Sequence, residues 1–379
     1  MFTASTFSHI ANFHRPYLRA FHDLGWQVHV ACGGAAAPIP EADRIFSLPL
    51  EKKMTAPQNF LAQRQLRRLL AENDYALVCA HTSLAAFFTR RAAAFCPRRP
   101  PLVNVVHGYL FDDKTPPLRR AVLLAAEKWT APQTDLLLAM NRWDFALAKR
   151  EGLSRDVRLI PGMGVDATRF DGAPAVSRGA LRQRLGLSPS DFALIYPAEF
   201  SARKNQSLLI RGLSDLPEEV KLILPGQGAQ LEECRALARQ LRMENRIVFP
   251  GQIADLYPWF SAADAAVSSS RSEGLPFNVM EAMCCRLPVA VSRVKGHTDL
   301  IRDGETGLLF SRDDADGFAG CVRRLQNDAA LAARLAAAGR DAVRPYLLPA
   351  VLPQVMDAYL SAAGAEARPA AETRAAGVR

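Results

Sequence analysis

Two glutamates eight positions apart enclose a loop that suits a charged ligand rich in hydroxyl groups. A strand is predicted to end near Ser268 and a helix to begin near Asn278. Backbone N–H groups at such a helix start bind anions, so a diphosphate fits there. Carboxylates instead accept hydrogen bonds from hydroxyls, which makes Glu273 and Glu281 candidates to hold a sugar and a ribose. The simpler explanation for Glu281 is that it favours the helix dipole. The loop between the two glutamates consists of Gly274, Leu275, Pro276, Phe277 and Asn278.

Two adjacent cations follow another predicted strand, at 192–197. Arg203 and Lys204 lie in the loop that opens a helix predicted over 205–212, which begins at Asn205. Together they can neutralise a diphosphate, and each charge-assisted hydrogen bond contributes about 1.5–3 kcal/mol. An Arg-Lys pair at the solvated start of a helix is the structural alternative.

A histidine ends a predicted strand in the first half of the chain. His107 is the last residue of the strand predicted over 102–107. Ligands bind at the carboxyl ends of parallel strands, so His107 is a site candidate, although a lone histidine is more often structural. The segment Pro225-Gly226-Gln227-Gly228 also follows a strand and is expected to pass close to a ligand. It contains only Gly-x-Gly, so a dinucleotide-binding fingerprint is not supported.

Short apolar runs alternate with longer helical patterns along the whole chain. Helices are predicted over 11–24 and 60–72, where apolar residues recur at three- and four-residue spacing. Near-continuous apolar strands joined by helices are typical of parallel sheets covered on both faces. The sequence therefore predicts an α/β protein with two Rossmann-like domains facing across a cleft. The strands are predicted over 2–5, 28–32, 76–80, 102–107, 135–140 and 157–160, and over 192–197, 220–225, 246–249, 265–268, 288–291 and 307–310.

The domain boundary is predicted in a segment rich in glycine and proline, at 160–166. This gives a first domain over 1–165 and a second over 166–345. An apolar helix is expected over 346–363. The tail over 364–379, rich in alanine, glutamate and arginine, is expected to be disordered.

The composition, 49% hydrophobic and 22% charged over 379 residues, is that of a globular protein with two cores. No apolar run reaches the roughly 18 residues of a membrane-spanning helix, and the N-terminus does not resemble a signal peptide. The seven cysteines form no Cys-x-x-Cys pair. This indicates a reducing compartment, the cytoplasm, and argues against a zinc site.

The net charge of +9 is concentrated in the first half of the chain. Residues 1–165 hold 21 basic and 13 acidic side chains, which gives +8 and leaves 26 against 25 for the rest. A solvated arginine-rich surface explains this charge equally well. No nucleic-acid-binding motif accompanies it, so an anionic membrane or a diphosphate-bearing acceptor is the favoured functional explanation.

Taken together, these segments resemble the retaining glycosyltransferases of family four, which have the GT-B fold. The strongest part is the Glu-x7-Glu element from Glu273 to Glu281. Other first-half segments look like the branch that builds bacterial capsular and exopolysaccharide repeat units. The supporting segments are Ile160-Pro161-Gly162-Met163-Gly164-Val165-Asp166, Arg203-Lys204-Asn205, Phe249-Pro250-Gly251 and Gly304-Glu305-Thr306-Gly307-Leu308-Leu309-Phe310. Those of the branch are Ser8-His9-Ile10-Ala11-Asn12-Phe13-His14, Thr82-Ser83-Leu84, His107-Gly108-Tyr109 and Glu127-Lys128-Trp129.

The resemblance implies a UDP-sugar donor, often N-acetylated, and an acceptor glycan on a polyprenyl diphosphate at the cytoplasmic membrane face. The second domain would bind the nucleotide sugar, the first would lie on the acceptor side, and a C-terminal helix would cross back to the first. A basic first domain agrees with a peripheral protein on an anionic leaflet. No cofactor and no metal are implied, because fixed cations stabilise the leaving diphosphate.

The resemblance also implies a role for each site residue. Lys204 with Arg203 and Asn205 would hold the donor diphosphate, and Glu273 would bind hydroxyls of the donor sugar. The amides of Gly274 through Asn278 would contact sugar and phosphate, and Glu281 would take the ribose hydroxyls. His107 would lie beside the sugar and shape the reaction face. Ser8, His9 and Tyr109 are the acceptor-side candidates.

The sequence departs from the family pattern at two places. Most members carry Gly-Arg-Leu where this chain has Ala198-Glu199-Phe200. Either Arg203 substitutes for the missing arginine, or this branch manages with Lys204 alone. The first strand is also shorter than the family pattern, so either the true start lies upstream or the strand is short.

Two other functions compete with sugar transfer. A non-catalytic, nucleotide-sugar-binding scaffold of a polysaccharide-assembly complex is favoured by Glu199 and disfavoured by the presence of Glu273, Lys204 and His107. A nucleotide-sugar epimerase would need a set of acid and base side chains in the first domain, and the sequence shows no such cluster. It would form isomerised nucleotide sugar without an acceptor.

Overall fold

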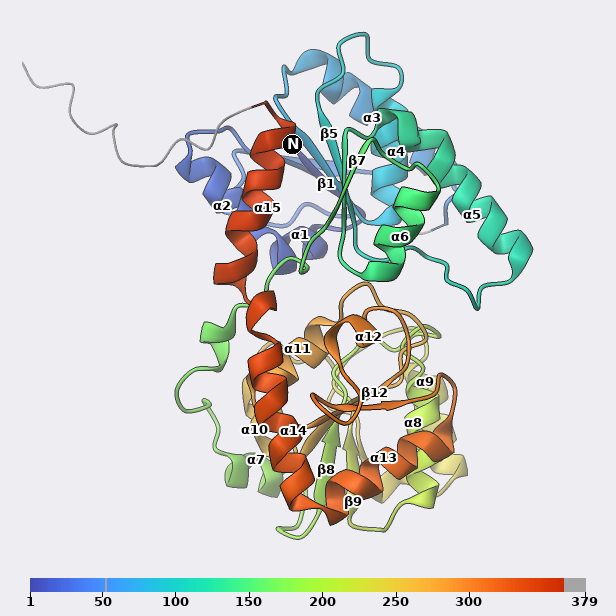
Figure 1. The fold of residues 1–379 in the computed structure, drawn as a ribbon, viewed down its shortest axis with the longest axis vertical. Coiled ribbons are helices and arrows are strands. Elements are labelled where there is room, and N and C mark those ends of the chain that lie inside the picture. Colours follow the sequence, from blue (N-terminus) through green and yellow to red (C-terminus); the bar gives the residue numbers. More distant parts are fainter. Residues whose placement is uncertain (52, 365–379) are drawn as a thin grey trace, which may run out of the picture. The chain divides into compact units, whose positions relative to one another are not determined.

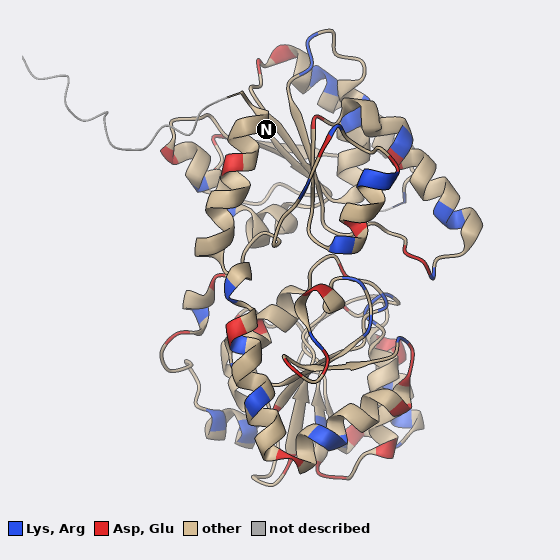
Figure 2. Ribbon diagram, viewed as in Figure 1, with Lys and Arg blue, Asp and Glu red and all other residues tan. Residues whose placement is uncertain are grey.

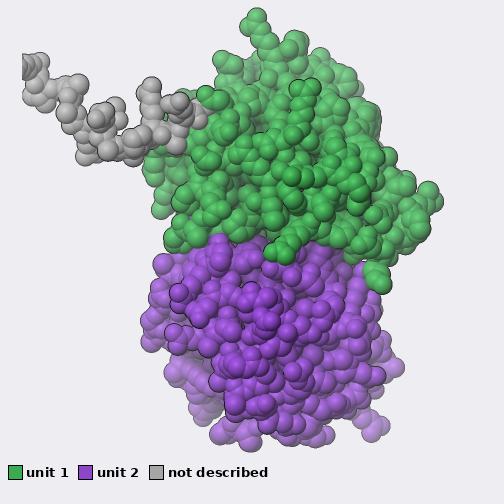
Figure 3. Space-filling model, viewed as in Figure 1, with its two compact units in different colours: residues 1–164, 349–379 green, residues 165–348 purple. Residues whose placement is uncertain are grey.

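The computed structural model describes residues 1–51 and 53–364, which form two compact units (Figures 1 and 3). Of the described residues, unit 1 contains those up to 164 together with 349–364, and unit 2 contains 165–348. The predicted disordered tail, 364–379, lies outside the described residues except for Gly364. Within the described chain, no helix is both long enough and apolar enough to cross a bilayer.

Unit 1 is built on a seven-stranded sheet in which all neighbouring strands are parallel. The strand order is β3-β2-β1-β4-β5-β6-β7. Most strands are fully buried apolar runs, because helices cover both faces of a parallel sheet. The strands are β1 (Phe2–Ala4), β2 (His29–Gly33), β3 (Arg44–Leu48), β4 (Val78–His81), β5 (Leu102–Val106), β6 (Leu136–Ala139) and β7 (Asp156–Leu159).

Seven α-helices accompany this sheet in the described part of unit 1. The last of them reaches unit 1 after the chain has passed through unit 2, so the C-terminal helix crosses back to the first domain. The ring of Tyr359 on this helix lies 6.0 Å from the rings of both Phe2 and Phe21. The helices are α1 (Phe7–Phe13), α2 (Arg15–Asp23), α3 (Pro57–Glu72), α4 (Ser83–Ala93), α5 (Pro117–Thr130), α6 (Arg142–Arg150) and α15 (Leu348–Ala362).

Two sequence-based predictions for unit 1 need correction. The single helix predicted over 11–24 is wrong, since α1 ends at Phe13 and α2 begins at Arg15. Pro16 lacks an N–H and its ring excludes the preceding helical turn, so the helix is interrupted and restarts. The strand β3 was absent from the prediction. It lies at the sheet edge, begins with an exposed arginine and is only partly buried, so its apolar pattern is weak.

Unit 2 repeats the architecture with a six-stranded parallel sheet in the order β10-β9-β8-β11-β12-β13. Side chains from the sheet and from its covering helices share one hydrophobic core. The strands are β8 (Phe192–Ile195), β9 (Val220–Ile223), β10 (Ile247–Val248), β11 (Ala265–Ser268), β12 (Val289–Ser292) and β13 (Leu308–Phe310). The helices are α7 (Arg178–Arg184), α8 (Gln206–Gly212), α9 (Leu231–Gln240), α10 (Tyr257–Ala262), α11 (Phe277–Cys284), α12 (His297–Leu300), α13 (Ala315–Asn327) and α14 (Ala329–Ala342).

The two sheets share one topology. Numbered within each unit, both begin with the order 3-2-1-4-5-6, so the strand order reverses beside the first strand. Loops that follow the first and fourth strands diverge at this reversal and leave a crevice where doubly wound sheets bind ligands. In unit 1 the reversal lies between β1 and β4, and in unit 2 it lies between β8 and β11. The fold is α/β of the GT-B type, and these two edges are where site residues should gather.

Candidate functional site

The loops after β8 and β11 are joined at the strand reversal of unit 2. The N–H of Arg271 donates to the carbonyl of Arg203 (2.8 Å), and the Ser269 hydroxyl donates to the carbonyl of Asn205 (2.8 Å). Asn205, the residue before α8, has a left-handed backbone (φ 54°) that turns the loop into the helix. Its side-chain amide donates to Asp313 (3.0 Å). The two predicted motifs therefore form one structure.

At the centre of this structure, the two predicted cations bind the first glutamate of the Glu-x7-Glu element. The Nζ of Lys204 lies 2.5 Å from Oε1 of Glu273, and an Nη of Arg203 lies 2.9 Å from Oε2. The side chains of Glu273 and Lys204 are 6% and 12% exposed, whereas that of Arg203 is 47% exposed. The buried Lys204–Glu273 pair is thus the core of the site, and Arg203 closes it from the solvent side.

The charges of this cluster shift one another's pKa values. Burial alone would raise the pKa of Glu273, but the charges of Lys204 and Arg203 outweigh it and hold the pKa far below its usual range. Burial lowers the pKa of Lys204, and the charge of Glu273 opposes this effect. These three side chains together carry a net positive charge, which the nearby carboxylate of Glu199 reduces, and the two cations are donors of the kind that bind a diphosphate.

Beneath Glu273 lies a set of buried polar side chains that the sequence did not identify. The Ser270 hydroxyl donates to Oε1 of Glu273 (2.5 Å) and lies 2.8 Å from the Tyr196 hydroxyl. Because Ser270 gives its one proton to the carboxylate, the single proton of the Tyr196 hydroxyl is shared between Ser270 and the carbonyl of Lys204, 3.2 Å away. His297 is fully buried near Glu273, and burial lowers its pKa to about 4. Ser270 thus binds Glu273 directly, and Tyr196 in turn binds Ser270.

Gly296 fits closely against the glutamate loop. Its φ is 80°, and a Cβ there would lie 2.8 Å from the carbonyl oxygen of Gly274 and 2.9 Å from the Cβ of Glu273. Gly226 and Gly228 play a comparable role, since a Cβ on either would lie 2.0 Å or 2.3 Å from a backbone oxygen of the loop after β8. The latter two glycines therefore allow the Pro225–Gly228 segment to lie directly against the loop after β8. That a ligand also passes close to this segment stays a prediction.

The second glutamate of the element lies on α11 and has a different environment. The Glu281 side chain is 14% exposed, and Arg169, 3.8 Å away, is its nearest cation. Burial raises the pKa of Glu281 to about 7, although Arg169 works in the opposite direction. The pKa values of the two glutamates are thus shifted in opposite directions. Near neutral pH, Glu273 is fully ionised and Glu281 is about half protonated.

The loop from Gly274 to Asn278 leads into α11. Pro276, the residue before this helix, has no side chain that could cap it, and in the first turn the side-chain oxygen of Asn278 accepts a hydrogen bond from the N–H of Val279 (3.0 Å). The amide of Asn278 donates to the carbonyl of Pro197 (3.0 Å) and ties the helix start to the end of β8. Leu275 is buried and Phe277 is half-buried. The helix start thus faces the same strand reversal as Lys204.

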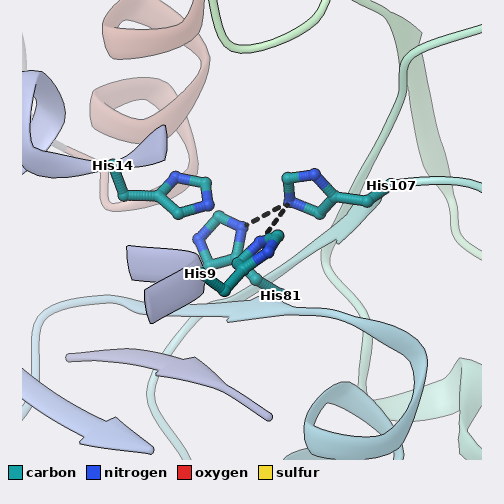
Figure 4. A group of neighbouring side chains, drawn as sticks. All are labelled: His9, His14, His81 and His107. Atoms are coloured by element: carbon teal, nitrogen blue, oxygen red, sulfur yellow. Dashed lines mark hydrogen bonds between the residues drawn. The ribbon is translucent and has the colours of Figure 1, made fainter. Parts of the chain in front are cut away.

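In unit 1, the predicted histidine lies in a cluster of four. His107 follows β5, and its Nε2 lies 3.3 Å from Nε2 of His9 and 3.1 Å from Nδ1 of His81 (Figure 4). His14 completes the group, with its ring 3.9 Å from that of His81, centre to centre. The sequence missed His14 and His81 as site residues. The signal for His81 was its place at the end of β4, next to the reversal.

The remaining acceptor-side candidates differ in exposure. Ser8 is exposed on α1, where its hydroxyl lies 3.0 Å from that of Thr6. Tyr109 is only 4% exposed, and its ring stacks on Phe111 in the core of unit 1. Glu127, from the Glu127-Lys128-Trp129 segment, is buried in a 2.7 Å ion pair with Arg90, which gives it a structural role.

Two family models match the chain, one for each half. Residues 17–169 match the model described as Glycosyltransferase Family 4, and residues 177–342 match that described as Glycosyl transferases group 1. The putative glycosyltransferase EpsD of Bacillus subtilis is 32% identical over 366 residues, 95% of each protein. The UDP-Gal:alpha-D-GlcNAc-diphosphoundecaprenol alpha-1,3-galactosyltransferase of Escherichia coli is 24% identical over 303 residues, 77% of each.

Solved structures agree on the fold. The Anabaena protein HepE, in its complex with UDP and glucose, superposes with a TM-score of 0.77 at 20% identity, covering 95% of this chain and 98% of that one. WaaG, a glycosyltransferase involved in lipopolysaccharide biosynthesis, gives a TM-score of 0.76 at 17% identity, covering 94% and 98%. The chain therefore belongs to the glycosyltransferases of GT-B fold whose first domain is of the Glycosyltransferase Family 4 type and whose second is of the group 1 type.

Proposed function

We propose that this glycosyltransferase moves a sugar, with retention of configuration, from a UDP-sugar to a lipid-linked glycan in surface polysaccharide biosynthesis. The observation that carries the proposal is the buried Lys204–Glu273 pair at the strand reversal of unit 2. The ammonium group of Lys204 is thereby fixed at the strand reversal, which is where a doubly wound domain binds phosphates. As hexosyltransferase donors, N-acetylated UDP-hexoses are the first to test.

The donor diphosphate binds to Lys204 and Arg203, with Asn205 shaping the loop. These cations stabilise the charge that develops on the leaving nucleotide, which is an electrostatic contribution to catalysis. Arg203 thereby takes the place of the arginine that the family pattern has at Glu199. The start of α11 adds backbone N–H groups from Gly274–Asn278 to the same anion site. The UDP-bound complexes of HepE support a uridine nucleotide.

The sugar and the ribose bind to the two glutamates. A carboxylate offers about four lone-pair sites, and Glu273 uses three of them for Lys204, Ser270 and Arg203. The remaining site, on Oε2, accepts a hydroxyl of the donor sugar. Glu281 accepts hydrogen bonds from the ribose hydroxyls. This division explains why the two carboxylates have different environments within one motif.

The acceptor binds to unit 1. His107 lies beside the transferred sugar and shapes the reaction face, with Ser8, His9 and Tyr109 on the acceptor side. The name of the E. coli relative specifies a diphosphoundecaprenol acceptor, which supports a polyprenyl-diphosphate-linked glycan here. Such an acceptor lies in the cytoplasmic membrane, so the protein works in the cytoplasm on the inner membrane face.

Unit 1 has a surface suited to that membrane. Leu118, Val122 and Trp129 lie along one side of α5 at helical spacing and are 79%, 61% and 60% exposed. Arg91 stacks on Trp129, 3.8 Å from the ring centre. Three basic residues, Arg119, Arg120 and Lys128, lie on the same helix, where Figure 2 shows blue segments. Exposed apolar side chains beside cations are typical of helices that lie in the interface of an anionic bilayer.

We expect the double substitution Leu118→Glu with Val122→Glu to weaken binding to vesicles of anionic phospholipid by tenfold or more. Full burial of such a side chain is worth about 1.5–3 kcal/mol, and about 1.4 kcal/mol is a tenfold change in affinity. Vesicle flotation at low and high salt measures the effect. Leu159→Glu, which places a charge on an exposed leucine of β7, is the matched control. Equal binding by all three proteins would exclude α5 as the membrane contact.

Nucleotide binding tests the proposal directly. A panel of nucleotides and UDP-sugars should include at least one that raises the melting temperature of the wild type, since a ligand at a hundredfold excess over Kd stabilises by about 2.7 kcal/mol. Lys204→Ala should lose this response, whereas the control Lys221→Ala, on β9, should keep it. Transfer to a polyprenyl-diphosphate glycan then identifies the acceptor. If no nucleotide shifts the melting curve of the folded wild type, the assignment of the donor site to Lys204 and Glu273 fails. Nucleotide binding without transfer to any acceptor would instead favour the non-catalytic scaffold.

A UDP-sugar epimerase is the second candidate, because unit 1 does contain a group of acid-base side chains, the four histidines. The sequence had given no sign of such a cluster. Incubation of the preferred UDP-sugar without acceptor separates the two activities. An isomerised nucleotide sugar indicates the epimerase, and an unchanged one indicates the transferase.

A further inference from the structure

The four histidines of unit 1 point their ring nitrogens toward one another (Figure 4). One coordinating atom from each of His9, His14, His81 and His107 lies within 4.8 Å of the others. They come from α1, the junction of α1 with α2, the end of β4 and the residue after β5. The strand reversal between β1 and β4 brings these distant segments together, and such a reversal is where open parallel sheets bind ligands.

Two of the nitrogen–nitrogen distances are those of neighbouring ligands around one ion. The Nε2 of His107 lies 3.3 Å from Nε2 of His9 and 3.1 Å from Nδ1 of His81. In a tetrahedral site with metal–nitrogen bonds of about 2.0–2.1 Å, neighbouring nitrogens are about 3.3–3.4 Å apart. A small inward or outward movement of the rings would therefore accommodate an ion.

Several nitrogens of the cluster lack hydrogen-bond partners within the described chain. They are both ring nitrogens of His14 and the Nε2 of His81, and both residues are fully buried. A buried polar group without a partner is destabilising, so such groups are nearly always satisfied by protein, water or an ion. A bound cation would accept the lone pair of His14 and give that side chain a partner.

The chemistry of the cluster selects the kind of ion. The four side chains are imidazoles that lie against one another at the strand reversal, and a neutral imidazole keeps the lone pair that metals bind. Within the described residues, the group consists of histidines alone. Imidazole nitrogens suit zinc, nickel and copper, whereas magnesium and calcium require oxygen ligands.

We propose that His9, His14, His81 and His107 bind one divalent transition-metal ion of the zinc type. The site goes beyond the proposed function, which assigns His107 to the reaction face and His9 to the acceptor side without a metal. The donor residues belong to unit 2, and the test below measures metal binding rather than sugar transfer. It differs from both sequence-based expectations about metals. One concerned the donor diphosphate, which the cations of unit 2 neutralise, and the other was the argument against a zinc site from the lack of a Cys-x-x-Cys pair, whereas the ligands proposed here are histidines.

Metal titration of the full-length, untagged protein tests this proposal. After treatment with a chelator, the wild type should bind one Zn²⁺ per chain in calorimetry, and Co²⁺ should give the visible absorption of a tetrahedral site. His9→Asn and His81→Asn should each weaken Zn²⁺ binding by more than the roughly 10–100-fold that loss of an outer partner of a metal ligand costs. Mg²⁺ should produce no saturable binding to unit 1.

The exposed His22 provides the matched control, since its side chain is 60% exposed and outside the cluster. His22→Asn should bind Zn²⁺ as the wild type does. His9 lies at the edge of the cluster and is half-buried, so His9→Asn is expected to fold, and circular dichroism verifies this. The proposal is overturned if the wild type shows no stoichiometric binding, or if folded His9→Asn and His22→Asn bind Zn²⁺ equally.

Discussion

Replacing Glu273 with glutamine is expected to destabilise unit 2 by about 3–5 kcal/mol, because the substitution leaves the Lys204 ammonium buried without its counter-charge. For a unit of this size, such a loss lowers the melting temperature by roughly 10 °C. The loss should shrink as the pH rises. Without Glu273 the folded-state pKa of Lys204 falls further below that of the unfolded chain, so the native state binds fewer protons and gains stability with increasing pH.

A double-mutant cycle isolates the pair. Lys204→Met should cost less than Glu273→Gln, because Arg203 still balances the carboxylate, and the combined variant should recover part of the loss. Glu232→Gln is the control, since its pair with Arg235 is exposed on α9 and should contribute less than about 1 kcal/mol. Urea unfolding of the five proteins measures these differences. Additive effects of the two substitutions would show that the ion pair does not hold the loops together.

The second large effect concerns pH. The affinity for UDP should weaken as the pH falls below about 7, by a factor that approaches ten for each pH unit. Glu281 takes up a proton in this range, and its neutral carboxyl group accepts hydrogen bonds from the ribose hydroxyls less well than the carboxylate does. Glu281→Gln should bind UDP weakly at every pH, with a flat profile. Calorimetric titration at several pH values on both sides of about 7 measures this dependence.

The same carboxyl group gives a stability signature with a defined sign. Its folded pKa, about 7, exceeds the ordinary value of 4.5, so the native state holds a proton that the unfolded chain releases. Stability therefore falls as the pH rises from 4.5 to 7, by about 3 kcal/mol, and Glu281→Gln should abolish that slope. Arg169→Ala should move the binding midpoint to higher pH, because the nearest cation is lost. An unchanged profile in both variants would assign the titration to another group.

Much of the fold was predictable because local pattern and global topology agree. Buried parallel strands are continuous apolar runs, so eleven of the twelve predicted strand positions needed changes of only one or two residues at an end, and β11 matched. Edge strand β3 was missed because exposure on one side interrupts its apolar run with Arg44 and Ser47. The break at His14 was missed because Pro16 is tolerated in the first turn of a helix as well as at a break.

The sequence identified several residues of the site, but it did not show which of them contact one another. The sequence placed Lys204 and Glu273 after two separate strands, and each was assigned a different part of the donor. Their ion pair depends on β8 lying next to β11, which spacing along the chain does not reveal. His81 escaped notice for the same reason, because it meets His9 only through the adjacency of β4 with β1.

The return of α15 to unit 1 sets the order in which the protein can be completed during synthesis. Phe2, Tyr17 and Phe21 leave the ribosome early, but their neighbour Tyr359 follows more than three hundred residues later. At a synthesis rate of about 5–20 residues per second, this part of unit 1 waits for roughly 15–70 s. Unit 2 is continuous in sequence and is fully synthesised before α15. Unit 1, which begins the chain, is therefore the last to complete its hydrophobic core. Until α15 has been synthesised, the apolar side chains that it covers stay exposed, and exposed apolar surface of this kind is what chaperones bind.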